Sequence, residues 1–257
     1  MIEVKVTYTA NAGVMIQINE NAVLLDALSH DHDLVYAQTP ETLASQIING
    51  LPPFERIDAI LYTHLHRDHF SASLTEQFMA KHTKSKLFIG NHVIETLKSN
   101  VRFQLALRSE NVILLKQDLE THNDTNAFTI VAIKTKHMGE EFSSVQHYMY
   151  HIEMGGVTIL FLGDTEPMAD NFKYLETLGK GIDVLVAPFP YLSTTNGLLF
   201  VKEIIKPKHV VTVHLPPREK DTYHWYEATL KMYNRKLAQE VPATFALELG
   251  HTYTFSI

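Results

Sequence analysis

A short segment in the first third of the chain concentrates side chains that bind metal ions. Residues 63–70 read T-H-L-H-R-D-H-F, which places three histidines and one aspartate within six residues. His64 and His66 are two apart, so in an extended segment they point the same way and can approach one ion together. Asp68 and His69 follow where the chain begins to turn, and they can face a second position nearby. Imidazole and carboxylate groups suit zinc, manganese or iron, so the segment predicts a metal site.

The plainer interpretation of this segment is a polar surface loop in which histidines have gathered by chance. Against it, the segment directly follows residues 57–62, an apolar run with the pattern of a buried strand. One loop cannot fill two coordination spheres, so more ligands must come from elsewhere. His137, Asp164 and His214 each end a strand-like apolar run. Open α/β sheets place their ligand-binding loops at the carboxyl ends of strands, so we expect these three residues to join the first segment.

The elements that must position these side chains alternate between strands and helices. Strand-like runs lie at 4–9, 14–18, 23–28, 57–63, 86–89, 112–115, 128–134, 146–153, 157–162, 183–187, 210–213, 243–249 and 253–257. Helices are predicted at 40–49, 73–82, 170–178, 197–205 and 223–237, with a short helix after Asn91. The list is typical of an α/β protein. Two central sheets with helices packed outside would use it, as would other α/β layouts.

Composition limits the remaining classes of protein. The chain has 257 residues, 15 histidines and no cysteine, which excludes disulfides, cysteine-ligated zinc, iron–sulfur clusters and a cysteine nucleophile. Its 29 acidic and 22 basic residues give a net charge of −7, which argues against a general nucleic-acid-binding protein. We find no linker, repeat, membrane-length apolar run or signal peptide. We therefore expect a single domain spanning residues 1–257, located in the cytoplasm.

The order of these candidate residues resembles the metallo-β-lactamase-fold hydrolases. The matching residues are the H-x-H-x-D-H segment at 64–69, His137, Gly163-Asp164-Thr165, His214, and the earlier segments 10–14 and 23–26. The resemblance therefore covers nearly the whole chain. It implies a four-layer αββα sandwich of two mixed sheets with outer helices. Within the superfamily, the chain looks most like the branch of ascorbate-phosphate lactonase-like hydrolases.

The resemblance also implies a role for each matched residue. One metal ion would be held by His64, His66 and His137, a second by Asp68, His69 and His214, and both would be bridged by Asp164. Asp26 would orient the ligand loop through hydrogen bonds. Two divalent ions, with zinc expected ahead of manganese or iron, would provide a bridging hydroxide that cleaves a small ester, lactone or phosphodiester. Asp68 and Asp164 would be the catalytic carboxylates.

Four further residues are candidates for a substrate pocket. His30 and His32 follow the strand that ends near Asp26, and His251 follows a glycine in a late turn. Tyr191 follows an apolar strand and a proline. Each has a plainer interpretation as a solvated loop residue, a turn residue or a core tyrosine.

Other notable residues are interpreted as structural. His147 and His151 lie four apart and share one face of a strand, although His147 is near enough to His137 in sequence to be a rival ligand. Arg102 and Arg108 could meet an anionic substrate, but a solvated helix face explains them more simply.

Three functions remain open at this stage. The first is a dinuclear hydrolase that acts on a small molecule, without a membrane and with nucleic acid disfavoured. The second is a phosphodiesterase or nuclease on the same scaffold, which a basic channel leading to the metals would favour. The third is a metal-binding protein without turnover, which a closed site would favour. The sequence carries no signal of the oligomeric state.

Overall fold

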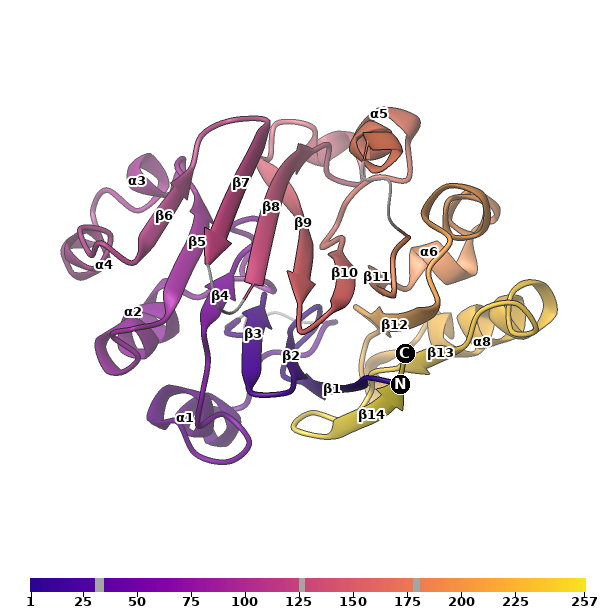
Figure 1. The fold of residues 1–257 in the computed structure, drawn as a ribbon, viewed down its shortest axis with the longest axis horizontal. Coiled ribbons are helices and arrows are strands. Elements are labelled where there is room, and N and C mark those ends of the chain that lie inside the picture. The colour runs from indigo at the N-terminus through magenta and orange to yellow at the C-terminus, as the bar shows by residue number, and fades with distance from the viewer. Residues whose placement is uncertain (31–34, 125–127, 178–180) are drawn as a thin grey trace.

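Two seven-stranded sheets form the centre of the structure (Figure 1). The computed structural model describes residues 1–30, 35–124, 128–177 and 181–257. The strands of the first sheet are β1 (Glu3–Tyr8), β2 (Val14–Ile18), β3 (Asn21–Leu25), β4 (Ala59–Leu61), β5 (Lys86–Gly90), β6 (Val112–Leu115) and β14 (Thr252–Ser256). Those of the second sheet are β7 (Leu119–Asp124), β8 (Phe128–Thr135), β9 (His147–Met154), β10 (Val157–Phe161), β11 (Val184–Pro188), β12 (His209–Val213) and β13 (Ala243–Phe245).

Helices flank both sheets (Figure 1). They are α1 (Glu41–Asn49), α2 (Ala72–Lys81), α3 (Val93–Thr96), α4 (Val101–Ala106), α5 (Ala169–Phe172), α6 (Pro190–Ser193), α7 (Thr195–Leu199) and α8 (Trp225–Lys236). Among the residues that the structure describes, no helix is long and apolar enough to cross a membrane.

Both sheets mix parallel and antiparallel pairing. The first has the order β14-β1-β2-β3-β4-β5-β6, antiparallel as far as β3 and parallel from there to β6. The second has the order β13-β12-β11-β10-β9-β8-β7, parallel from β13 to β10 and antiparallel from β10 to β7. The predicted pair of mixed sheets is confirmed.

Three apolar cores show how these elements form layers. One core lies between the two sheets, one between the first sheet and α1, α2 and α4, and one between the second sheet and α5 to α8. Successive strand residues serve different cores, because side chains alternate across a strand. In β3, for example, Val23 and Leu25 belong to the core between the sheets, whereas Leu24 packs against the outer helices. The predicted αββα sandwich is therefore confirmed.

The structure differs from the predicted elements in a few places. Strand β7 was missed because its sequence, L-E-T-H-N-D, is polar. Within the described part of the chain it pairs only with β8, at the edge of its sheet. Helix α2 begins at Ala72, one residue earlier than predicted, and is capped by Ser71, whose hydroxyl accepts from the Leu74 amide. The helix predicted at 170–178 ends at Phe172 and continues as a 3₁₀ turn to Thr177.

The strands bring the predicted ligand positions to one end of the sandwich. Strands β8, β10 and β12 run in the same direction, and just beyond their carboxyl ends lie His137, Asp164 and His214. The loop after β4 joins them from the other sheet, because the carbonyl of Thr63 accepts the amide of Tyr148 at 2.9 Å. The strand topology thus places the candidate ligands together at the carboxyl ends of the strands, where α/β sheets usually bind ligands.

Candidate metal centre

The loop after β4 turns sharply once it has passed His66. The amides of His69 and Phe70 both donate to the carbonyl of His66, at 3.0 and 2.9 Å. This turn reverses the chain before α2, so His69 faces back toward His64, with 4.1 Å between the ring centroids. His64 and His69 are buried, and His66 is half-buried. The segment therefore presents its ligands in two directions, as the spacing predicts.

Asp26 anchors this loop from beneath. Its Oδ1 accepts the amide of Thr63 at 2.8 Å, and its Oδ2 accepts the Thr63 hydroxyl at 2.6 Å and lies 2.8 Å from Nδ1 of His69. Because a carboxylate only accepts, the proton of His69 sits on Nδ1. Nδ1 of His64 lies 2.9 Å from the Thr63 hydroxyl oxygen, whose own hydrogen is committed to Asp26, so this nitrogen is also a donor. Both rings therefore point Nε2 toward the site, and this is the nitrogen that would bind a metal ion once it has lost its proton.

Asp164 occupies the middle of the cluster. Its Oδ2 lies 3.4 Å from Nε2 of His137 and 3.3 Å from Nε2 of His69, and its Oδ1 lies 3.4 Å from Nε2 of His214. Nδ1 of His137 donates to the carbonyl of Met138, which leaves its Nε2 free to face the carboxylate. One carboxylate thus contacts imidazoles from both expected metal positions.

Three groups of ligand atoms have the spacing that a metal ion requires. One of them, Asp26 with His64 and His69, includes the carboxylate that anchors the loop, and the other two match the expected ligand sets. His64, His66 and His137 form one group, and Asp68, His69 and His214 form the other. Nε2 of His64 lies 2.9 Å from Nδ1 of His66, and in the second group the two imidazole nitrogens are 3.3 Å apart. Ligand atoms on one tetrahedral ion lie roughly 3.3 Å apart when each bond is about 2.0–2.1 Å. The donor set also fits, since it contains only nitrogen and oxygen.

Unsatisfied polar atoms point to the same conclusion. Nε2 of His137 and Oδ1 of Asp164 are buried and have no hydrogen-bond partner among the described residues. An unpartnered buried group of this kind costs about 1–3 kcal/mol. A cation that both atoms would coordinate would remove this cost. The residues present therefore fit a metal ion.

The charges of the centre compensate one another in the metal-free chain. Burial opposes the charged form of His214, but the carboxylate of Asp164 outweighs it and raises the pKa of His214 to about 9. Burial likewise opposes the charge of Asp164, yet His214 and His69 hold its pKa well below the ordinary value. In the same way, His69 and His214 overcome burial and lower the pKa of Asp68 to about 2. Protons on imidazoles thus stabilise the carboxylates, and bound cations would take their place.

Two site residues have unusual backbone conformations. Asp26 and His214 have positive φ angles of 46° and 66°. Residues other than glycine rarely adopt this region, which costs on the order of 1–3 kcal/mol and tends to occur at functional sites.

Three residues at the centre have contacts that the sequence did not predict. Asn11 donates from Nδ2 to Oδ2 of Asp68 at 2.9 Å, and its carbonyl accepts the amide of His214. The ring of Tyr36 stands edge-on to His214, with 4.4 Å between centroids. The only signal for Asn11 was its place in the segment that resembles the family, and Tyr36 carried none. The third residue, His147, was interpreted as structural, yet its Nε2 accepts the amide of Asp164 at 3.0 Å.

The pocket candidates lie in different surroundings. His30 is exposed, and its amide donates to the carbonyl of Arg67 within the ligand loop. His251 is half-exposed, with its Nδ1 3.9 Å from a carboxylate oxygen of Glu248. Tyr191 is fully buried and its hydroxyl donates to the carbonyl of Thr165, so it supports the Asp164 loop instead of lining a pocket. His32 lies outside the described residues.

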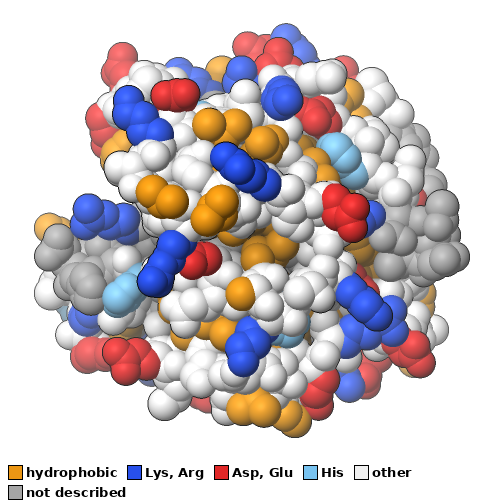
Figure 2. Space-filling model, turned by 90° about the vertical axis from the view of Figure 1, so that its left-hand side faces the viewer, with side chains coloured by type: hydrophobic (Ala, Val, Ile, Leu, Met, Phe, Trp, Pro, Cys, Tyr) orange, Lys and Arg blue, Asp and Glu red, His pale blue; other side chains and the backbone are white. Residues whose placement is uncertain are grey.

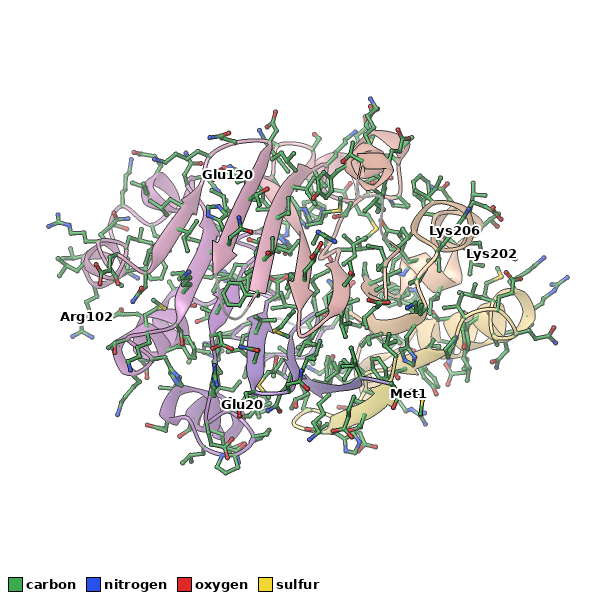
Figure 3. All side chains as sticks on the ribbon, in the orientation of Figure 1. Met1, Glu20, Arg102, Glu120, Lys202 and Lys206 are labelled. Atoms are coloured by element: carbon green, nitrogen blue, oxygen red, sulfur yellow. The ribbon has the colours of Figure 1, made fainter. Side chains whose placement is uncertain are left out.

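The basic residue of α4 points away from the sheets. Contact with an anionic substrate was the alternative interpretation of Arg102, but its side chain projects outward from α4 (Figure 3). This placement agrees with a solvated helix face.

The fold and the cluster together define a metallo-β-lactamase-type protein with a candidate two-metal site. A family model described as the beta-lactamase superfamily domain matches residues 21–231, a span that contains all seven ligand candidates and Asp26. The chain therefore belongs to this superfamily. A search of curated proteins finds no significant match.

Solved structures share the fold at low sequence identity. The metallo-beta-lactamase fold protein YhfI from Bacillus subtilis is 16% identical, with a TM-score of 0.66 over 99% of this chain and 100% of that chain. A putative metal-dependent hydrolase from Parabacteroides distasonis is 16% identical, with a TM-score of 0.64 over 96% and 94%. CmlA from Streptomyces venezuelae, described as a diiron beta-hydroxylase, is 14% identical, with a TM-score of 0.63 over 100% of this chain and 54% of that one.

Proposed function

We propose that this chain is a dinuclear metal-dependent hydrolase of a small ester, lactone or phosphodiester. The observation that carries the proposal is the position of Asp164, whose two carboxylate oxygens contact imidazoles of both ligand groups. His64, His66 and His137 would hold one ion, and Asp68, His69 and His214 the other. Two divalent ions bound in this way would supply a hydroxide nucleophile at neutral pH and would polarise the oxygen of the bond under attack.

The chain's own residues hold and orient this centre. Asn11 fixes one oxygen of Asp68, which keeps that carboxylate directed at its group and placed to orient a water molecule or accept its proton. Burial, with Asp164 and Asp68 nearby, raises the pKa of Tyr36 to about 12. Its phenol is therefore protonated at neutral pH and is a donor for an oxygen of the substrate. No protein nucleophile is required, which agrees with the absence of cysteine.

The identity of the metal stays a proposal in which zinc comes before manganese or iron. The nitrogen and oxygen donors suit all three ions. A structure with the same fold is described as a diiron enzyme, so iron is to be measured beside zinc.

Charge favours a small-molecule substrate over nucleic acid. The net charge is −7, and a nuclease would need a basic tract that neutralises phosphates. On the face that Figure 2 shows, Lys and Arg side chains are interspersed with Asp and Glu. We therefore place the nuclease, or phosphodiesterase, second.

A substrate screen on metal-loaded protein tests the proposal. Lactone, ester, thioester and phosphodiester substrates are assayed with zinc, manganese or iron, before and after removal of the metal by a chelator. We expect hydrolysis of at least one class, loss on chelation and recovery on adding metal back. The variant His66→Ala should lose this activity while its thermal unfolding stays cooperative, whereas His122→Ala, in β7 at the sheet edge, should keep it. Full activity in metal-stripped protein would refute the mechanism, and a fully loaded protein without turnover would favour the metal-binding alternative.

A further inference from the structure

A cavity of about 520 Å³ opens between the loop after β12 and the segment before β14. Its walls come from residues 215–219 and 247–249, together with Tyr8 and Ala37. The volume lies within the range of roughly 300–1,000 Å³ that is typical of small-molecule sites. The cavity is therefore large enough to hold part of a substrate.

Two residues that line the cavity are adjacent in the chain to residues of the candidate metal centre. Leu215 directly follows the ligand candidate His214, and Ala37 directly follows Tyr36. The ring of Tyr36 in turn packs edge-on against His214. Two walls of the cavity are thus continuous in the chain with residues that contact each other at the metal centre.

A third wall is tied to the centre by hydrogen bonds. The hydroxyl of Tyr8 donates to the carbonyl of Asn11 at 3.2 Å, and the same carbonyl accepts the amide of His214 at 2.8 Å. Asn11 also binds Asp68 through its side chain. A group seated against Tyr8 would therefore lie beside the residues that orient the second ligand group.

The chemistry of the walls favours an uncharged apolar occupant. Leu249 is exposed and Pro217 and Leu247 are partly exposed, so these three residues offer apolar surface to the cavity. The exposed charges at the rim are two carboxylates, from Glu219 and Glu248, against one guanidinium. That guanidinium, of Arg218, lies 4.5 Å from the ring centroid of Tyr226, so one of its faces is already covered. An anionic group such as a phosphate would meet a net negative rim.

We propose that this cavity binds an uncharged apolar chain of the substrate, which makes the substrate an ester or lactone bearing such a chain and not a phosphodiester. The inference rests on the proposed hydrolase function and adds to it the class of substrate. Burial of each methylene contributes about 0.8 kcal/mol, which corresponds to about a fourfold change in kcat/KM.

Two substrate series test the cavity in the metal-loaded protein. Esters of 4-nitrophenol from acetate to octanoate keep the leaving group constant, and alkyl acetates from methyl to octyl keep the acyl group constant. We expect kcat/KM to rise in at least one series, by up to about fourfold for each buried methylene. Flat profiles in both series would overturn the proposal.

Variants that fill the cavity supply the second test. Leu249→Trp enlarges a rim residue that is 39% exposed, and Ala37→Leu enlarges a buried wall residue, so the pair does not depend on one substitution folding well. Leu199→Trp is the matched control, because Leu199 is 53% exposed on α7 outside the cavity walls. In both cavity variants, the ratio of kcat/KM for the eight-carbon substrate to kcat/KM for the shortest substrate should fall by at least about tenfold. The control should keep the ratio of the unaltered protein. A dependence that survives in both cavity variants would contradict the assignment.

A binding measurement separates the cavity from the catalytic function. Calorimetric titration with 1-hexanol and with ethanol needs no turnover and uses uncharged probes. Tighter binding of 1-hexanol that Leu249→Trp removes supports the cavity even if every ester proves inert, in which case only the proposed function fails. Hydrolysis without any preference for 1-hexanol would instead retain the function and overturn the cavity.

Discussion

The backbone amide of Asp164 donates a hydrogen bond to Nε2 of His147 at 3.0 Å. Since Nε2 accepts, the ring proton sits on Nδ1, which donates to the hydroxyl of Thr135 at 2.7 Å. Both nitrogens are thereby committed, so His147 positions Asp164 and is not available as the rival ligand that its place near His137 suggested.

Replacing His147 should loosen the carboxylate of Asp164. His147→Leu removes the acceptor and leaves the amide of Asp164 unpaired, and partners in this position are typically worth 10–100-fold in metal affinity. His147→Gln keeps an acceptor of similar reach and should retain most of that affinity. Competition with a chromophoric chelator measures both variants. Equal metal affinities in the His147→Leu and His147→Gln variants would show that the contact does not position the ligand.

Asp26→Asn should weaken the second ligand group. Both carboxylate oxygens of Asp26 accept hydrogen bonds, two from Thr63 and one from Nδ1 of His69. The amide of an asparagine would have only one accepting oxygen, and its NH₂ group would face a donor. The opposed donors should cost about 1–3 kcal/mol of unfolding free energy and lower metal affinity about 10–100-fold. Urea unfolding of metal-free protein and metal titration measure the two effects separately. A variant that matched the parent chain in both would remove Asp26 from the account.

Gly163→Ala should damage the centre through Thr63. Gly163 has φ 52°, and a Cβ atom there would lie 2.6 Å from Cγ2 of Thr63, whose hydroxyl is held by Asp26. The backbone strain alone costs about 1–2 kcal/mol, and displacement of Thr63 adds to it. Gly181→Ala is the control, because a Cβ atom there meets nothing within 4 Å. Thermal or urea unfolding should show a loss of at least about 1 kcal/mol in the first variant only; equal stabilities would contradict the packing argument.

The sequence indicated the candidate ligands, which the structure brings together, but not the residues that support them. His64, His66 and Asp164 are metal-binding types placed at strand ends, where topology alone brings them together. The role of His147 depends on register, because Thr135 pairs with His147 across β8 and β9. No local pattern encodes that pairing.

Loop residues were harder to predict for the same reason. Asn11 and Asp68 are 57 residues apart, and their hydrogen bond exists only because β1 and β4 belong to one sheet. The fold class could be inferred because its strands are β-branched and apolar. Strand β7 lacks that pattern and is held by its edge pairing with β8.

The metal-free chain should lose stability as the pH rises above neutrality. Burial alone would lower the pKa of His214, but Asp164 raises it from 6.5 to about 9. The stabilisation is fully present below about pH 6.5 and is lost as the pH rises through about 9, at up to about 1.4 kcal/mol per pH unit for one proton. Urea unfolding of chelated protein at pH 6, 7.5 and 9 measures this slope, which His214→Gln should reduce. A stability that rose over this range would contradict the charge pairing.

The count of tightly bound divalent ions per chain tests the central claim most directly. The protein is saturated with zinc, manganese or iron in separate samples and then dialysed. The bound metal is measured by inductively coupled plasma mass spectrometry. The account predicts two ions per chain for at least one metal, and about one in His66→Ala or His214→Gln, each of which removes a ligand from a different group. A ratio of one or less in the unaltered chain with every metal would contradict the two-ion centre.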